Sequence, residues 1–148
     1  MARLDYADTS WRQLNLPHDW AIEGDFSVDN PSGAGGGALP GGIGWYRKHF
    51  TVPASLSDDN RLFITFDGVY MNSSVYINGH LLGTRPYGYS SFQYDLTPYL
   101  RRGADNLIAV RVDNSDQPNS RWYSGCGIYR HVWLTTTSPL HIANWGVY

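Results

Sequence analysis

The chain has 148 residues, of which 42% are hydrophobic and 16% charged, with a formal net charge of −2. This length suits one domain, and the small net charge gives no electrostatic reason to expect binding to nucleic acid or to a membrane surface. No apolar run reaches the roughly 18 residues of a membrane-spanning helix. The opening MARLDYADTS lacks the apolar stretch of a signal peptide. A single cysteine, Cys126, excludes an internal disulfide and a cysteine-built zinc site, and leaves both periplasmic or secreted and reducing locations open.

The residue types favour β-structure. Six Trp and eleven Tyr are a heavy aromatic load, whereas Glu23 and Lys48 are the only residues of their kinds. Sixteen glycines and eight prolines add turn-forming residues. Because aromatic residues favour strands and long flexible side chains favour helices, this balance predicts an all-β domain.

The segment 29–44, DNPSGAGGGALPGGIG, contains seven of the glycines. Because glycine loses much conformational freedom when it is ordered, the segment is expected to form a long mobile loop, such as a lid or a contact to a neighbouring domain. It lacks the Lys-Ser/Thr ending of a phosphate-binding loop, and a strand-like segment rather than a helix follows it. A nucleotide-phosphate site is therefore not expected here.

Alternating apolar residues predict the strands that follow. Lys48 interrupts the first of them and is expected near an edge. The predicted strands and the residues that share one face are 45–52 (Tyr46, Phe50, Val52), 61–68 (Leu62, Ile64, Phe66), 90–96 (Phe92, Tyr94, Leu96), 107–114 (Ile108, Val110, Val112) and 130–137 (Val132, Leu134, Thr136).

A hairpin is predicted over 73–83, SSVYINGHLLG, because Asn78-Gly79 separates two strand-like runs and suits a type I′ turn. The segment 97–106 is expected to form a helical turn and a loop. No apolar period of 3.6 residues continues beyond about two turns. Short strands separated by turn residues predict an all-β jelly-roll β-sandwich.

Six motifs occur in an order that resembles one enzyme family: LNLPHDWAIEG, GWYRKHF, FDGVYMNSSVYINGHLLG, YGYSSFQYDLTPYL, NLIAVRVDN and NSRWYSGCGIYRHVWL. From Trp11 to Tyr148 the chain resembles the N-terminal sugar-binding domain of β-galactosidase-like members of glycoside hydrolase family 2. The resemblance implies a galactose-binding-domain-like jelly roll, followed by an immunoglobulin-like domain and a (β/α)₈ catalytic barrel. β-Glucuronidases and β-mannosidases share this architecture, so the identity of the sugar stays open.

The residues themselves argue against catalysis by this chain. Retaining glycosidases use two carboxylic acids about 5–5.5 Å apart. Only one Glu is present, and most of the twelve Asp stand in turn-like contexts such as SDDN and VDNSD. The resemblance places the two catalytic glutamates in the barrel. No catalytic residue, cofactor or metal site is expected, and the five histidines show no metal-ligand spacing.

The stretch 119–134 holds the main candidates for sugar binding. Aromatic rings cover the apolar C–H faces of a sugar, and Arg and Asn bind its hydroxyls. Asn119, Arg121 and Trp122 supply both kinds of group on one loop. The resemblance implies that this loop approaches the mouth of the barrel, although some members carry Asp where this chain has Arg121 or a neighbour. The alternative for Arg121 and Trp122, and the expectation for Tyr123, is packing against another domain.

The motif PHDW supplies the fourth candidate, Asp19. Adjacent residues of an extended segment point to opposite faces, so His18 and Asp19 are not expected to form a relay. The resemblance places Asp19 near the substrate, whereas the residues favour a turn anchor beside a partly buried His18. Arg130 is expected to bind loop carbonyls or an aspartate such as Asp113.

Three functions remain open. The chain is expected to be the non-catalytic accessory domain of a multidomain exo-glycosidase, with carbohydrate and the immunoglobulin-like and barrel domains of the same polypeptide as its partners. The alternatives are an autonomous carbohydrate-binding module and a brace for oligomer assembly. Cys126, between two glycines, is expected to be a small buried residue.

Overall fold

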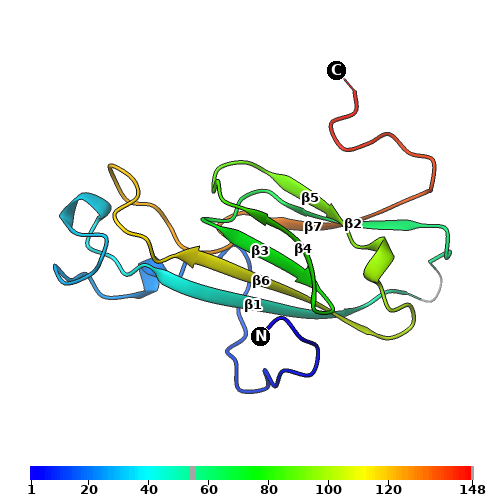
Figure 1. Cartoon of the computed structure of the whole chain (residues 1–148), viewed down its shortest axis with the longest axis horizontal. Helices are drawn as coiled ribbons and strands as arrows, with labels where there is room; N and C mark the ends of the chain where they lie inside the picture. Colours follow the sequence, from blue (N-terminus) through cyan, green and yellow to red (C-terminus); the bar gives the residue numbers. More distant parts are fainter. Residues whose placement is uncertain (54–55, 148) are drawn as a thin grey trace.

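The computed structural model describes residues 1–53 and 56–147 and shows two packed antiparallel β-sheets (Figure 1). Within these residues one sheet has the strand order β1-β6-β3-β4 and the other β5-β2-β7. The strands are β1 (Gly42–Thr51), β2 (Arg61–Phe66), β3 (Ser73–Ile77), β4 (His80–Arg85), β5 (Phe92–Asp95), β6 (Asp105–Asn114) and β7 (Val132–Thr137). Three single-turn 3₁₀ helices are η1 (Ala21–Glu23), η2 (Ala34–Gly36) and η3 (Thr97–Tyr99). The predicted all-β sandwich is confirmed.

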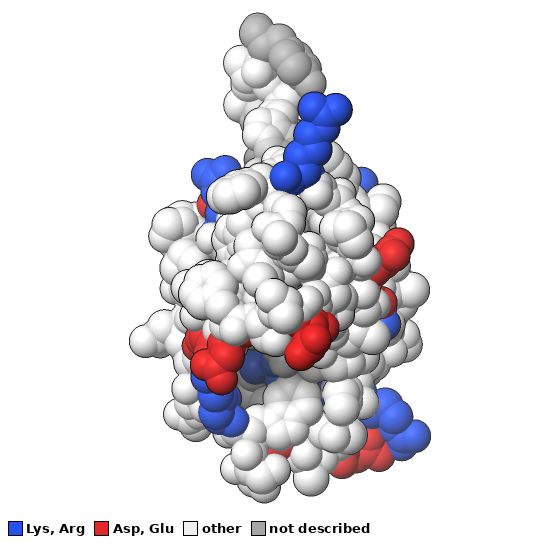
Figure 2. Space-filling view, turned by 90° about the vertical axis from the view of Figure 1, so that its left-hand side faces the viewer, with Lys and Arg blue, Asp and Glu red and all other residues white. Residues whose placement is uncertain are grey.

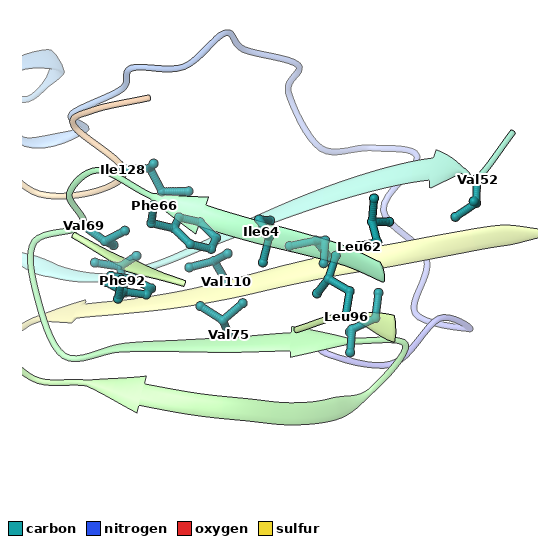
Figure 3. Close-up of a cluster of buried hydrophobic side chains, with 13 residues drawn as sticks. Val52, Leu62, Ile64, Phe66, Val69, Val75, Phe92, Leu96, Val110 and Ile128 are labelled. Atoms are coloured by element: carbon teal, nitrogen blue, oxygen red, sulfur yellow. The ribbon is translucent and has the colours of Figure 1, made fainter. Parts of the chain in front are cut away.

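The core lies between the two sheets (Figure 3). It is built from the alternating residues of the central strands, which are Leu62, Ile64 and Phe66 of β2 and Ile108, Val110 and Val112 of β6. Phe66 stacks on Phe92 of β5, with ring centroids 5.1 Å apart. The strand faces predicted for β2 and β6 are therefore confirmed. None of the helices in the described part of the chain is long and apolar enough to cross a membrane.

Strand β7 is an exception to the predicted burial. Leu134 was expected on the inward face, but 53% of its surface is exposed, and Thr136 is exposed as well. Both residues lie on the side of β7 that faces the core, as their pairing with the buried Ile64 and Leu62 of β2 shows. The alternating pattern predicted the correct face of β7, but among the described residues no further strand covers this edge of the sandwich.

The predicted hairpin between β3 and β4 is confirmed. Asn78 and Gly79 both have positive φ angles, of 50° and 89°, as a type I′ turn requires. The Asn78 side chain also crosses to the neighbouring strand: Oδ1 accepts the Leu107 N–H at 2.9 Å, and Nδ2 donates to Asn106 Oδ1 at 2.9 Å. The turn is thereby attached to the start of β6.

The glycine-rich segment 29–44 is not one long loop, which corrects the prediction. It contains η2, and its last three residues belong to β1. Ser32 is buried and donates to the Leu39 carbonyl at 2.7 Å. Gly44 lies under the Trp20 ring, where an added Cβ would be 2.5 Å from the nearest ring carbon. The glycine is needed for this close approach, and such tertiary contacts order the segment despite the entropy cost of its glycines.

Residues 1–11 are attached to β1 mainly through Arg47, with a second contact of 3.2 Å between His49 Nε2 and Asp8 Oδ2. The Arg47 side chain is only 2% exposed because this N-terminal segment covers it. Its guanidinium donates to the Asp8 carboxylate at 2.7 Å and to the carbonyls of Arg3 and Tyr6 at 3.0 and 3.1 Å. The Tyr6 ring lies 5.4 Å from the guanidinium carbon, within cation–π range. The guanidinium has five donors in a fixed planar arrangement, whereas a lysine ammonium has three donors on a flexible stem.

We expect Arg47→Met to release the N-terminal segment, because the new side chain keeps an apolar stem and loses every donor. Trypsin should then cleave after Arg3 and Arg12 roughly tenfold faster, which corresponds to about 1.4 kcal/mol. A time course analysed by mass spectrometry measures both rates. Arg61→Met, which alters an exposed arginine on β2, is the matched control. Equal cleavage in both variants would contradict the assigned role.

Candidate functional site

The two loops that carry the candidate sugar-binding residues lie at the same end of the sandwich. Residues 12–41 precede β1, and residues 115–131 join β6 to β7; the light-blue-to-cyan part of the first and the yellow-to-orange part of the second lie at the left-hand end of Figure 1. The backbone N–H of Trp20 donates to the backbone carbonyl of Cys126 at 3.0 Å, so the two loops are directly linked. Figure 2 views this end and shows mostly uncharged residues. The surface therefore presents no strong electrostatic field of one sign.

Asp19 joins these loops through its carboxylate. Oδ1 accepts the N–H of Ala21 at 2.9 Å and that of Cys126 at 2.8 Å, and Oδ2 accepts the Tyr123 hydroxyl. Gly125 lies against this carboxylate, where an added Cβ would be 2.5 Å from Oδ2. Burial, together with the Asp19 carboxylate, raises the pKa of Tyr123. Asp19 thus has the contacts of the turn anchor that the residues favoured.

Asn119 is held at both ends of its amide. Nδ2 donates to Asn114 Oδ1 at 2.6 Å and to the Asp116 carbonyl at 2.9 Å. Oδ1 accepts the Tyr70 hydroxyl at 3.1 Å and the Ser124 hydroxyl at 3.3 Å. These bonds occupy the amide in fixing the loop between β6 and β7.

Arg121 and Trp122 take no part in these contacts. Trp122 is 72% exposed, and Arg121 is also exposed. Within residues 1–53 and 56–147, neither side chain makes a hydrogen bond or ion pair. The Ser120 hydroxyl donates to the Trp122 carbonyl, which tightens the tip of the loop. The four predicted residues therefore divide into two that hold the loop and two that it presents.

A group of tyrosines beside Asn119 was not predicted. Tyr87 and Tyr89, on the loop between β4 and β5, are both exposed, and their ring centroids lie 5.6 Å apart. Tyr89 also meets Tyr70 edge to face at 5.2 Å, and Tyr70 donates to Asn119. Tyr129 donates to the backbone of the same loop at 2.8 Å. The short motif PYGY, with two aromatics around a glycine, is the sequence signal that could have indicated this group.

His18 is satisfied and partly buried, as predicted. Its Nδ1 lies 2.7 Å from the Tyr46 hydroxyl, and its Nε2 lies 2.8 Å from an Arg12 nitrogen and 3.2 Å from Glu23 Oε1. The hydrogen bond from Arg12 holds the pKa of Glu23 below its usual value, and burial raises the pKa of Tyr46. The single glutamate of the chain is therefore ion-paired.

Two further expectations have different outcomes. Arg130 was expected to bind loop carbonyls or an aspartate such as Asp113, but it is exposed and makes neither contact among the described residues, and Asp113 accepts from Arg111 at 2.8 Å and from Ser115. Cys126 is buried, as predicted, and burial raises the pKa of its thiol to about 11. In the described part of the chain, no group of three or more His, Cys, Asp or Glu side chains could hold a metal ion.

Comparisons with known proteins define the family. The sequence model described as "Glycosyl hydrolases family 2, sugar binding domain" matches residues 37–138. The chain belongs to this family. It is 66% identical over 148 residues to the β-galactosidase BoGH2A of Bacteroides ovatus, covering 99% of this chain and 17% of that protein. A β-glucuronidase of Formosa agariphila is 36% identical over 159 residues, which cover 94% of this chain and 15% of that protein.

A solved structure shows the same fold. The glycosyl hydrolase family 2 member from Bacteroides cellulosilyticus matches with a TM-score of 0.92 and 44% identity, over 97% of this chain and 19% of that one. The chain thus has the sugar-binding fold of family 2, and it spans less than a fifth of the length of these relatives.

We expect Asp19→Ala to destabilise this sugar-binding domain by about 2–4 kcal/mol, because two backbone N–H groups and one hydroxyl lose their acceptor. Urea denaturation followed by tryptophan fluorescence measures the loss. Tyr123→Phe removes only one of the three bonds and should cost about 1 kcal/mol. A loss for Asp19→Ala no larger than that for Tyr123→Phe would show that the carboxylate does not anchor both loops.

The raised pKa of Cys126 predicts a loss of stability at high pH. The thiol of the unfolded chain ionises near its ordinary value of 9.0, before the buried thiol does near 11. The stabilisation is therefore complete below about pH 9 and is lost as the pH rises through about 11. Between pH 8 and 10.5, the free energy of unfolding should fall by roughly 1–2 kcal/mol more than in Cys126→Ala. Parallel curves for the two proteins would refute this assignment.

Proposed function

We propose that residues 1–148 form one sugar-binding domain of a longer, β-galactosidase-like glycosidase, in which Arg121 and Trp122 contact the saccharide. Family membership and the 66% identity to a β-galactosidase support the sugar and the enzyme class. The observation that carries the site is the loop itself. Asn119 and Asp19 anchor it, and it presents one indole and one guanidinium without internal partners among the described residues.

The chemistry of these two groups suits a sugar. The flat indole of Trp122 packs against the C–H face of a pyranose, and the Arg121 guanidinium donates hydrogen bonds to ring hydroxyls. An Arg also binds a carboxylate through two parallel hydrogen bonds, so Arg121 is suited to a uronic acid as well as to a neutral sugar. Because the loop is already fixed by Asn119 and Asp19, little conformational entropy is lost when a ligand binds.

In this proposal the domain itself does not hydrolyse the glycosidic bond. A general acid in a glycosidase has a raised pKa, whereas the pKa of Glu23 is lowered by Arg12. The two carboxylic acids would come from sequence outside residues 1–148. Exposed apolar side chains near the same end, Phe26 and Val28, support contact with neighbouring domains. Oligomer assembly stays a prediction.

The runner-up is an autonomous carbohydrate-binding module. It is favoured by the exposure of Trp122 in the isolated chain, since no other domain is needed to form the platform. The two functions differ in what the purified chain does alone. A module binds sugar by itself, whereas an accessory domain contributes only when the remaining domains are present.

The test has two parts. The purified chain and the full-length protein are titrated with galactose, glucuronate, galacturonate and short β-glycans, and kcat/KM of the full-length protein is measured with the β-glycans. We expect the full-length protein to lose roughly tenfold or more in kcat/KM with Trp122→Ala or Arg121→Ala, because one desolvated contact is worth about 1–2 kcal/mol. Trp145→Ala, at a tryptophan of the C-terminal segment that is 61% exposed, is the control. Unchanged kcat/KM in both loop variants would refute the site.

Calorimetry on the isolated chain then separates the two functions. Binding that disappears in Trp122→Ala indicates an autonomous module. No binding to the isolated chain, together with the loss of kcat/KM in the full-length variants, indicates an accessory domain.

A further inference from the structure

The inward face of strand β7 is left partly uncovered by the described residues. On the neighbouring strand β2, the inward residues Leu62, Ile64 and Phe66 are all buried. On β7 the corresponding Leu134 is 53% exposed. Burying a leucine side chain stabilises a protein by about 1.5–3 kcal/mol, so an inward leucine left half open marks an unfilled place in the sandwich.

An apolar groove lies at this place. It has a volume of about 230 Å³ and is lined by Phe50, Thr51, Val52, Pro53, Leu56, Leu62, Leu134 and Thr136. The lining joins the edge strand of one sheet, β1, to the edge strand of the other, β7. Val52 and Leu62 also belong to the core cluster and lie toward its right-hand end in Figure 3. The groove is therefore an opening into the hydrophobic core.

The backbone of β7 is available for pairing on the same side. In the part of the chain that the structure describes, β7 pairs only with β2, so alternate residues direct their N–H and C=O groups away from the sheet. Natural edge strands are protected by charged residues, prolines or very short length. Strand β1 carries Lys48 and His49, β4 carries Arg85, and β5 has only four residues. Strand β7, VWLTTT, has none of these protections.

We propose that the free edge of β7 binds a further β-strand, supplied by sequence outside residues 1–148 of the same polypeptide. This inference rests on the proposed function, in which the chain is one domain of a longer glycosidase. Its relatives have the necessary additional length, since the chain spans 17% of the Bacteroides β-galactosidase. The edge is uncharged, and a charge buried in the groove would be costly, so the complementary strand is uncharged too.

The pleat defines which residues this strand carries. Residues of paired strands that lie side by side point to the same face. Residues beside Leu134 and Thr136 therefore enter the groove and are branched or aromatic, whereas residues beside Trp133 and Thr135 point outward. Six residues of β7 allow a partner of about 20 Å. This is strand addition, in which backbone hydrogen bonds supply affinity and alternate side chains supply specificity.

The chain contains a suitable probe in its own sequence. The probe is a synthetic peptide of residues 60–67, NRLFITFD. In the protein this segment contains β2, which pairs with β7 and places Leu, Ile and Phe on one face. The experiment adds this peptide to the purified chain and follows hydrogen exchange of individual backbone amides by NMR. The control peptide, NRLFPTFD, has proline at the central position and cannot continue a backbone ladder.

We expect NRLFITFD to slow exchange of the outward β7 amides by tenfold or more and to leave β5 unchanged, while the proline peptide has no effect. Leu134→Lys should abolish the protection, and circular dichroism checks that this variant, altered at an already exposed side chain, stays folded. Trp122→Ala should bind the peptide normally, so this result and the sugar result can fail separately.

Three outcomes would overturn the proposal. No protection of β7 at millimolar peptide would show that the edge does not accept a strand. Protection of β5 alone would place the binding at the other edge of the sheet. Protection of β7 that rises with protein concentration in the absence of peptide, together with a dimer in sedimentation, would show that the partner is a second copy of this chain.

Discussion

The carboxylate of Asp19 sets the relation between the two loops at the sugar-binding end. It accepts one N–H from its own turn, and one N–H and one hydroxyl from the loop between β6 and β7. Hydrogen bonds to a charged acceptor are stronger than those between neutral groups, so three of them on one side chain hold two segments more than 100 residues apart in sequence. Together with the bonds of Asn119, this contact fixes the loop that carries Arg121 and Trp122.

Much of the fold follows from simple alternation. Strands β2 and β6 lie in the middle of their sheets, and for them the pattern predicted both the strand and the buried face. For β7 it predicted the strand and the direction of Leu134 but not its exposure, because a period of two defines a face and says nothing of what covers it. Composition failed for the glycine-rich segment, since the contact between Gly44 and Trp20 is a property of tertiary packing.

The sequence predicted the chemistry of the candidate site but not which of its residues hold the loop and which are exposed. Arginine, tryptophan and asparagine on one loop indicated a sugar contact, but only the structure shows that Asn119 is occupied by internal bonds while Trp122 is exposed. The partner of Asp113 could have been found from sequence, because Arg111 lies two residues away and therefore on the same strand face. The motif PYGY could have indicated Tyr87 and Tyr89 as exposed aromatics, but only the fold brings their loop beside Asn119.

The burial of Cys126 has a practical consequence. Its sulfur lies 3.0 Å from the Asn114 amide nitrogen, inside the small cluster with Ala21 and Leu39, and is closed off from reagents in solution. A cysteine introduced at any exposed position would then be the single reactive thiol of the folded chain. A fluorophore or spin label could be attached beside either the Trp122 loop or the edge of β7 without first removing the native residue.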